Sequence, residues 1–197
     1  GSDLWFYRGD SDRDAGSPVG HEPMGVVEEV GDDVTSVDPG DRVLAPFAIS
    51  CGECEFCRKG LHTSCENGDS WGGDNGGGQG EYVRSTHADG TLVRVPDRHA
   101  DDEETLRSLL PLTDVLGTGH HAAVSAGVEA GSTVAVVGDG AVGLCGVLAA
   151  RRLGAERIVA VGHHEDRLEL AEEFGATETV SERGEAAVER VRELTYG

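Results

Sequence analysis

The second half of the chain alternates short apolar runs with amphipathic segments. Two runs rich in β-branched residues, 133–137 and 157–161, have the length and composition of buried strands. Helical patterns come between and after them: one ends at Gly154, and two more cover 165–174 and 185–194. Because buried strands that alternate with helices form parallel sheets, this half predicts a parallel α/β domain.

The first half follows a different pattern. Short strands punctuated by glycine are expected at 24–30, 41–45 and 92–95. Residues 48–80 carry four cysteines and many glycines with little periodicity, so we expect an irregular lobe there. The first half therefore predicts a mostly β domain that contains a cysteine-rich lobe.

The change of pattern falls near the middle of the chain. A helical pattern covers 109–127 and leads from the strand-rich part into the alternating part. We therefore predict two domains with the boundaries 1–115 and 116–197.

Charge narrows the classes of partner. The chain has 16 basic and 37 acidic side chains, a formal net charge of −21. Such a surface repels nucleic-acid phosphates and anionic lipids, so neither nucleic-acid binding nor a membrane role is expected. No apolar stretch approaches the roughly 18 residues of a membrane span, and no secretory signal pattern is visible. We expect a cytoplasmic protein, and the acidic excess favours a halophilic source, where salt screens self-repulsion.

Four cysteines have the spacing of a metal site. They form a C-x2-C-x2-C-x7-C run that consists of Cys51, Cys54, Cys57 and Cys65. Four thiolates on a short loop can close a tetrahedral shell around a structural Zn²⁺. The alternatives are a disulfide framework, which an intracellular chain disfavours, and an iron–sulfur cluster, whose common runs are spaced differently. His62 is expected to be a loop residue rather than a ligand, and Cys145 a small buried hydrophobe.

A glycine motif follows the run at 133–137 and opens a helical pattern. In such a motif the first glycine permits a tight turn, the second lets a pyrophosphate approach, and the third lets the helix pack on the strand. The helix N-terminus offers N–H groups to the phosphates. The alternative is an ordinary strand-to-helix turn. The predicted dinucleotide-binding residues of this loop are Gly138, Gly140, Ala141, Val142 and Gly143.

The end of the second buried run predicts the cofactor. NAD sites normally place an acid there for the ribose 2′-hydroxyl, but this chain has Gly162. His163, His164 and Arg167 follow and suit a 2′-phosphate, so NADP is favoured over NAD. On this interpretation, Gly162→Asp would shift preference toward NAD. Glu165 and Asp166 are acids close to this position and argue for NAD instead. We expect them to begin the next helix rather than to contact the ribose.

Four ordered motifs resemble one known family. They are Gly-His-Glu-Pro-Met-Gly at 20–25 with Gly-Asp-Arg-Val at 40–43, the cysteine lobe, Leu-Thr-Asp-Val-Leu-Gly-Thr-Gly at 112–119, and the glycine loop at 138–143. Together they resemble the zinc-dependent medium-chain alcohol dehydrogenase family over essentially the whole chain. The resemblance implies an α/β fold class: a GroES-like, mostly β catalytic domain with a zinc lobe, then the first part of a Rossmann dinucleotide-binding domain.

The resemblance also implies a catalytic zinc. His21 and Asp114 match two ligand positions, with Glu22 beside them or as a transient ligand. The aspartate at the second of these positions is similar to the formaldehyde-dehydrogenase branch. Ser2 matches the hydroxyl that would pass the alcohol proton outward, and Thr118 would lie near the nicotinamide.

Two further positions are compared with the family pattern. Asp3 would lie just outside the ligand shell, and Trp5 stands where some members have a relay histidine. The family cysteine ligand would fall one residue before Gly1, and a full cofactor domain has about six parallel strands. We therefore expect a fragment that lacks both ends and is inactive alone.

The implied reaction is hydride transfer between an alcohol, polyol or sugar and NADP or NAD, with zinc as Lewis acid. The full-length protein is expected to be a homo-oligomer that acts on a small-molecule alcohol. Two alternatives remain open: a zinc-free, quinone-reductase-like member of the same fold, and a non-enzymatic zinc-binding interaction module.

Overall fold

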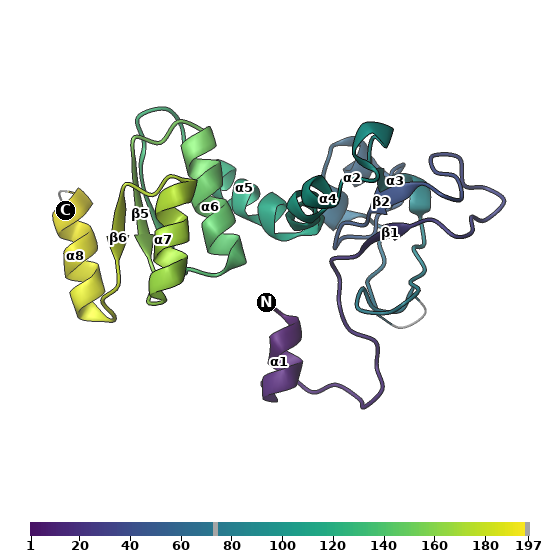
Figure 1. The fold of residues 1–197 in the computed structure, drawn as a ribbon, viewed down its shortest axis with the longest axis horizontal. Helices are drawn as coiled ribbons and strands as arrows, with labels where there is room; N and C mark the ends of the chain where they lie inside the picture. The colour runs from purple at the N-terminus through teal and green to yellow at the C-terminus, as the bar shows by residue number, and fades with distance from the viewer. Residues whose placement is uncertain (73–74, 196–197) are drawn as a thin grey trace. The chain divides into compact units, whose positions relative to one another are not determined.

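The computed structural model describes residues 1–72 and 75–195 and divides the chain into two compact units, Gly1–Asp114 and Val115–Gly197 (Figure 1). Residues 73–74 of the expected cysteine lobe and residues 196–197 of the expected cofactor domain lie outside the described part.

The first unit contains a small antiparallel sheet. Its strands are β1 (Met24–Val26), β2 (Arg42–Leu44) and β3 (Val93–Arg94), paired in that order. They are shorter than the predicted strands, although Val27 still exchanges backbone hydrogen bonds with Gly40 and Asp41 beyond the end of β1. Buried Leu44 packs with Val95 and Leu106 in the core beside this sheet.

Short helices make up much of the rest of this unit. The α-helices are α1 (Asp3–Arg8), α2 (Glu55–Arg58), α3 (Ala88–Thr91) and α4 (Glu103–Leu109). The 3-10 helices are η1 (His62–Ser64), η3 (Asp97–His99) and η4 (Leu110–Thr113). The sequence pattern did not predict α1. The side chain of Asp102 caps α4 by accepting hydrogen bonds from the N–H groups of Glu104 and Thr105.

The helix predicted over 109–127 is wrong in its first part. The segment forms η4 and then α5 (Val115–Ser125), with Asp114 between them at φ −152°. The carbonyl of Thr113 accepts a hydrogen bond from the N–H of Phe47 instead of continuing a helical ladder. The break therefore has a tertiary cause, and it frees Asp114 from helical geometry.

The second unit contains a parallel sheet, as predicted. The strands β4 (Thr133–Val137), β5 (Arg157–Val161) and β6 (Glu178–Val180) pair in sequence order, and the sequence pattern missed β6. The helices are α6 (Ala141–Arg152), α7 (Glu165–Phe174) and α8 (Glu185–Thr195). The first two strands and α7 have the predicted bounds.

Alternate residues of β5 face opposite sides of this sheet. Ile158 and Ala160 pack in a cluster with buried side chains of α6 and α7. Val159 packs with Val180 and with Ala187 of α8 on the other face. Helices therefore cover both faces, as Figure 1 shows within this unit.

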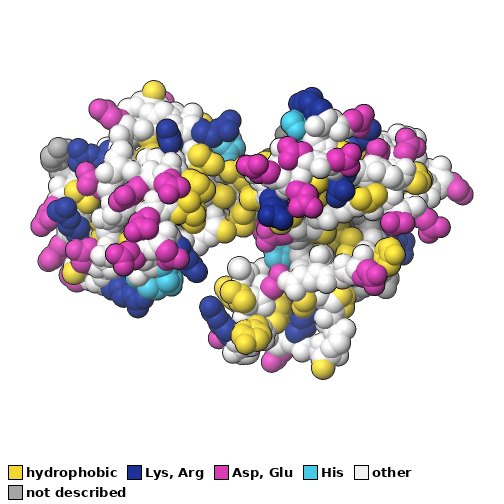
Figure 2. Space-filling view, in the orientation of Figure 1, with side chains coloured by type: hydrophobic (Ala, Val, Ile, Leu, Met, Phe, Trp, Pro, Cys, Tyr) yellow, Lys and Arg dark blue, Asp and Glu magenta, His cyan; other side chains and the backbone are white. Residues whose placement is uncertain are grey.

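Acidic side chains are spread over the visible face of each unit (Figure 2). Among the residues described, no helix combines the length and apolar character needed to cross a membrane.

Candidate metal centres and dinucleotide site

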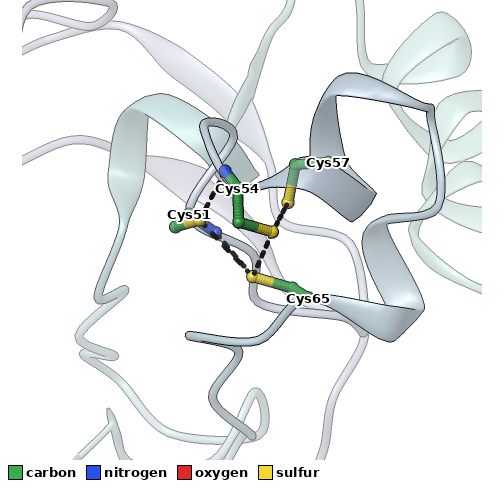
Figure 3. Close-up of side chains that lie close together, drawn as sticks. All are labelled: Cys51, Cys54, Cys57 and Cys65. Atoms are coloured by element: carbon green, nitrogen blue, oxygen red, sulfur yellow. Dashed lines mark hydrogen bonds between the residues drawn. The ribbon is translucent and has the colours of Figure 1, made fainter.

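The four spaced cysteines converge on one point. Their side chains point toward one another in Figure 3. The Sγ atom of Cys54 lies 3.5 Å from that of Cys57 and 3.9 Å from that of Cys65, which is 3.5 Å from that of Cys51. A tetrahedral shell with metal–sulfur distances of about 2.3 Å requires sulfurs about 3.8 Å apart. None of these cysteines forms a disulfide, so the cluster fits a Zn²⁺ ion.

Hydrogen bonds within the lobe stabilise the thiolate form of half-buried Cys51. The N–H of Glu53, the side chain of Asn67 and the N–H of Cys54 donate to Cys51 and lower its pKa to about 6. Burial raises the pKa of Cys57 to about 12. A cation is therefore needed to bring this buried thiol into the thiolate form that metal binding requires.

His62 lies outside this cluster. Its Nδ1 is 2.9 Å from Oγ of buried Ser50, which itself donates to the carbonyl of Gly90. Because that hydroxyl proton is engaged, Nδ1 of His62 acts as the donor. The ring thus ties η1 to the residue just before the first cysteine of the cluster.

A second group of possible ligands also lies within the first unit. Nε2 of His21 is 3.3 Å from Oδ2 of Asp114 and 3.6 Å from Oε1 of Glu22. The candidate ligand atoms of these three residues all lie within 4.8 Å of one another. On the opposite side of the ring, Nδ1 of His21 is 3.5 Å from Oδ2 of Asp3. The donor set of one imidazole and two carboxylates suits Zn²⁺, and a carboxylate on the second ring nitrogen orients such a ligand.

Two local features place these side chains. Gly20 has φ +97°, and a Cβ there would lie 2.6 Å from the backbone nitrogen of Gln79. The close approach allows the N–H of Gly78 to donate to the carbonyl of Gly20, which fixes the chain just before His21. The non-helical backbone of Asp114 brings the other ligand to the same place.

Two further predicted residues lie at or near the starts of helices. Ser2 lies at the N-cap of α1, next to Asp3, and Thr118 lies half-buried on α5 in the second unit. Their proposed parts in the reaction stay predictions.

The glycine loop has the geometry that the three glycines require. Gly138 has φ +113°, a conformation that other residues rarely adopt. A Cβ on Gly143 would collide with the carbonyl oxygen of Gly138, whereas a Cβ on Gly140 would meet nothing within 4 Å. The exposed Ala141 and Val142 begin α6 beside this open space. The loop therefore leaves room for a phosphate where the helix N-terminus points.

The end of β5 faces this loop. Gly162, His163 and a buried carboxylate, Asp139, line a cavity of about 540 Å³ together with Arg183 and part of α8. Nδ1 of His164 lies 2.9 Å from Oδ2 of Asp139, and Nη1 of Arg167 lies 3.7 Å from Oδ1 of the same carboxylate. The predicted cofactor residues of the strand end thus lie close to those of the glycine loop.

Asp139 was missed by the sequence reasoning. Its only signal was its place between two glycines of the loop. In the structure it accepts hydrogen bonds from the backbone N–H groups of both His163 and His164. It also occupies the space beside Gly162, so the expected simple exchange Gly162→Asp does not fit the native loop.

The two units with these clusters define a zinc-binding dehydrogenase architecture, and comparison with known families agrees. Residues 1–97 match the alcohol dehydrogenase GroES-like domain, and residues 141–197 match the zinc-binding dehydrogenase family. A medium chain reductase/dehydrogenase, ucsI, from an Acremonium species is 37% identical over 207 residues, covering 100% of this chain and 69% of its own length. The chain therefore belongs to the zinc-dependent medium-chain alcohol dehydrogenase family.

Two other relatives also match most of this chain. The glutathione-independent formaldehyde dehydrogenase of Bacillus subtilis is 40% identical, covering 92% of this chain and 46% of its own length. The structure of alcohol dehydrogenase TADH from Thermus sp. ATN1 superposes with a TM-score of 0.84 at 34% identity, covering 100% of this chain and 56% of its own. The chain thus spans about half the length of these two relatives.

Proposed function

We propose that the protein is a zinc-dependent oxidoreductase that transfers hydride between an alcohol or polyol and NAD(P). The observation that carries this proposal is the convergence of His21, Asp114 and Glu22 in a unit that also holds a separate cysteine cluster. The names of the relatives, which include alcohol and formaldehyde dehydrogenases, support the same reaction class.

In this proposal His21 and Asp114 hold the catalytic zinc, with Glu22 beside them or as a transient ligand. When bound, the metal supplies Lewis acidity to the alcohol oxygen. Asp3 lies beside Nδ1 of His21 and helps to orient the ring so that Nε2 faces the metal. Ser2 receives the alcohol proton and passes it to solvent.

The cysteine lobe has a structural part in this proposal. Sulfur spacings near those of a tetrahedral shell support a closed site with no position for substrate. Zinc there holds an irregular segment that has little regular secondary structure of its own.

The second unit binds the dinucleotide in this proposal. The open space at Gly140 takes the pyrophosphate, and Thr118 contacts the nicotinamide half. NADP is favoured over NAD, because His163, His164 and Arg167 surround a strand end that carries Gly162 in place of an acid.

The cellular setting is part of the same proposal. Unpaired cysteines suit the reducing cytoplasm, and the charge of −21 suits a halophilic source. The homo-oligomeric state is proposed from the family resemblance alone, and light scattering of the intact protein tests it.

Metal content and turnover test the function together. The intact protein should hold one zinc in each of the two clusters, and it should oxidise members of an alcohol panel with NADP or NAD. A single zinc per chain without alcohol oxidation contradicts the proposal. Quinone reduction with that single zinc would identify the quinone-reductase-like alternative, which lacks the catalytic zinc. The absence of both turnover and dinucleotide binding would identify an interaction module.

A further inference from the structure

The side chain of Asp139 fills the space where a side chain at Gly162 would begin. A Cβ at this position would lie 2.5 Å from Cβ of Asp139 and 2.6 Å from its Oδ2, distances that real Cβ contacts do not show. The backbone of Gly162 lies outside the left-handed region, so its conformation would accept a side chain. Space rather than backbone geometry therefore requires glycine at the end of β5.

Asp139 is held firmly in that space. Its Oδ2 accepts hydrogen bonds from the N–H groups of His163 at 2.8 Å and His164 at 2.9 Å, and Nδ1 of His164 is also 2.9 Å away. Only 8% of Asp139 is exposed. Burial raises its pKa, but the hydrogen bonds from the backbone of His164 and His163 outweigh this and hold the pKa well below its usual range. Asp139 is therefore an ionised group that cannot turn aside without losing these bonds.

The carboxylate at this edge of the sheet is thus engaged by protein donors. Oδ2 has three N–H partners, and Oδ1 faces Nδ1 of His164 at 3.1 Å and the guanidinium of Arg167 at 3.7 Å. An acid at position 162 would instead project from the strand end, where its acceptors would be open to a ribose. A side chain at position 162 would therefore occupy the same space as the side chain of Asp139.

We infer that Asp139 and Gly162 form a reciprocal pair in which Asp139 determines cofactor preference by excluding an acid from the end of β5. Asp139 acts as a positioning residue: it keeps position 162 bare and fixes the backbone that carries His163 and His164. The inference rests on the proposed dinucleotide binding and assigns its specificity to a residue of the glycine loop. Preference can then be changed only by moving the carboxylate from one position to the other.

A double-mutant cycle in the intact, zinc-loaded protein tests the pair. The variants are Asp139→Gly, Gly162→Asp and both together. The replacement at 139 must be glycine, because even the Cβ of an alanine would remain 2.5 Å from the new side chain. Gly162→Asp should lower the unfolding midpoint by about 8 °C or more in the native background, and by less than half as much in the Asp139→Gly background.

Binding of the two dinucleotides, measured by calorimetry, provides the specificity readout. Relative to Asp139→Gly alone, the double variant should bind NAD at least about tenfold better in comparison with NADP, because a carboxylate accepts from a 2′-hydroxyl and repels a 2′-phosphate. If Asp139 had only a structural role, Gly162→Asp would shift this ratio equally in the native and the Asp139→Gly backgrounds. Asp139→Asn, which keeps the size of the side chain, serves as a control and should not permit a side chain at 162.

The possible outcomes distinguish failure of the reciprocal pair from failure of the proposed function. Additive midpoints, or an unchanged NADP/NAD ratio in a protein that binds dinucleotide, overturn the reciprocal pair and leave the proposed function intact. If the double variant with aspartate does not fold, the cycle with Gly162→Ala measures the steric coupling, and additivity there overturns the pair. A native protein that binds neither dinucleotide overturns both.

Discussion

Nε2 of His21 lies 3.3 Å from Oδ2 of Asp114, although one residue follows a turn near the start of the first unit and the other ends it. The intervening chain carries the sheet and the cysteine lobe. This closure makes a possible metal site from side chains that no local pattern connects.

Removing an imidazole from this site should remove one metal ion. We expect His21→Ala to lose one zinc per chain and at least about 100-fold in kcat/KM, because a ligand and its orienting contact are both lost. Zinc analysis and steady-state kinetics check this. His121→Ala removes an exposed histidine of α5 and should leave both unchanged. Full zinc content in His21→Ala contradicts the assignment.

The cysteine lobe allows a matched comparison of two buried thiols. Cys57 is 5% exposed and Cys145 is 8% exposed, but only Cys57 lies in the cluster. Cys57→Ala should lose the lobe zinc and destabilise the protein by about 4 kcal/mol or more, since a structural metal contributes directly to folding. Cys145→Ala should keep the zinc. Equal metal content in the two variants would falsify the structural site.

The glycine loop predicts that one alanine substitution lowers stability and that another lowers dinucleotide affinity. Gly143→Ala should destabilise the second unit, because the new Cβ would collide with the carbonyl of Gly138. Gly140→Ala has open space, so its stability should change by less than about 1 kcal/mol while dinucleotide affinity falls. Thermal unfolding and calorimetric binding separate the effects. Normal binding by Gly140→Ala argues against pyrophosphate at this position.

Asp89 of α3 should make stability depend on pH. The side chain and N–H of Ser36, together with those of Thr35, donate hydrogen bonds of 2.7 to 3.1 Å to its carboxylate and hold its pKa well below its usual range. A lowered folded pKa stabilises the protein above the ordinary value of 3.8, and this contribution is lost as pH falls below it.

Urea unfolding of the native protein and Asp89→Asn checks the sign. The variant should be less stable at pH 7, and the difference should shrink as pH falls below about 4. Comparing the two proteins cancels effects of acid on the metal sites, and Asp33→Asn controls for the loss of one exposed charge. A difference that is constant from pH 7 to pH 3 contradicts the prediction.

Salt should stabilise the protein. With a net charge of −21, repulsion between acidic side chains opposes folding, and raising ionic strength from about 0.1 M to 1 M shortens the screening length from about 10 Å to 3 Å. We expect the free energy of unfolding to rise with KCl. An uncharged osmolyte controls for solvent exclusion, and a stability that falls with KCl contradicts a halophilic adaptation.

Features that depend on local spacing could be predicted from the amino-acid sequence alone. β4, β5 and α7 have the predicted bounds because side-chain periodicity within a few residues decides buried strand or amphipathic helix. The cysteines converge because their spacing is short enough for a single loop to close. The glycine motif could be interpreted since each glycine acts on neighbours in the same turn.

Contacts between distant segments became visible only in the folded chain. The helix predicted from Leu109 begins at Val115 because Phe47 binds the carbonyl of Thr113, and this break brings Asp114 to His21. The importance of Asp139 depends on the close approach of a loop and a strand end in space, which leaves no periodic pattern in the chain. A pattern within one segment records its own burial, whereas a contact between two segments depends on how both are packed.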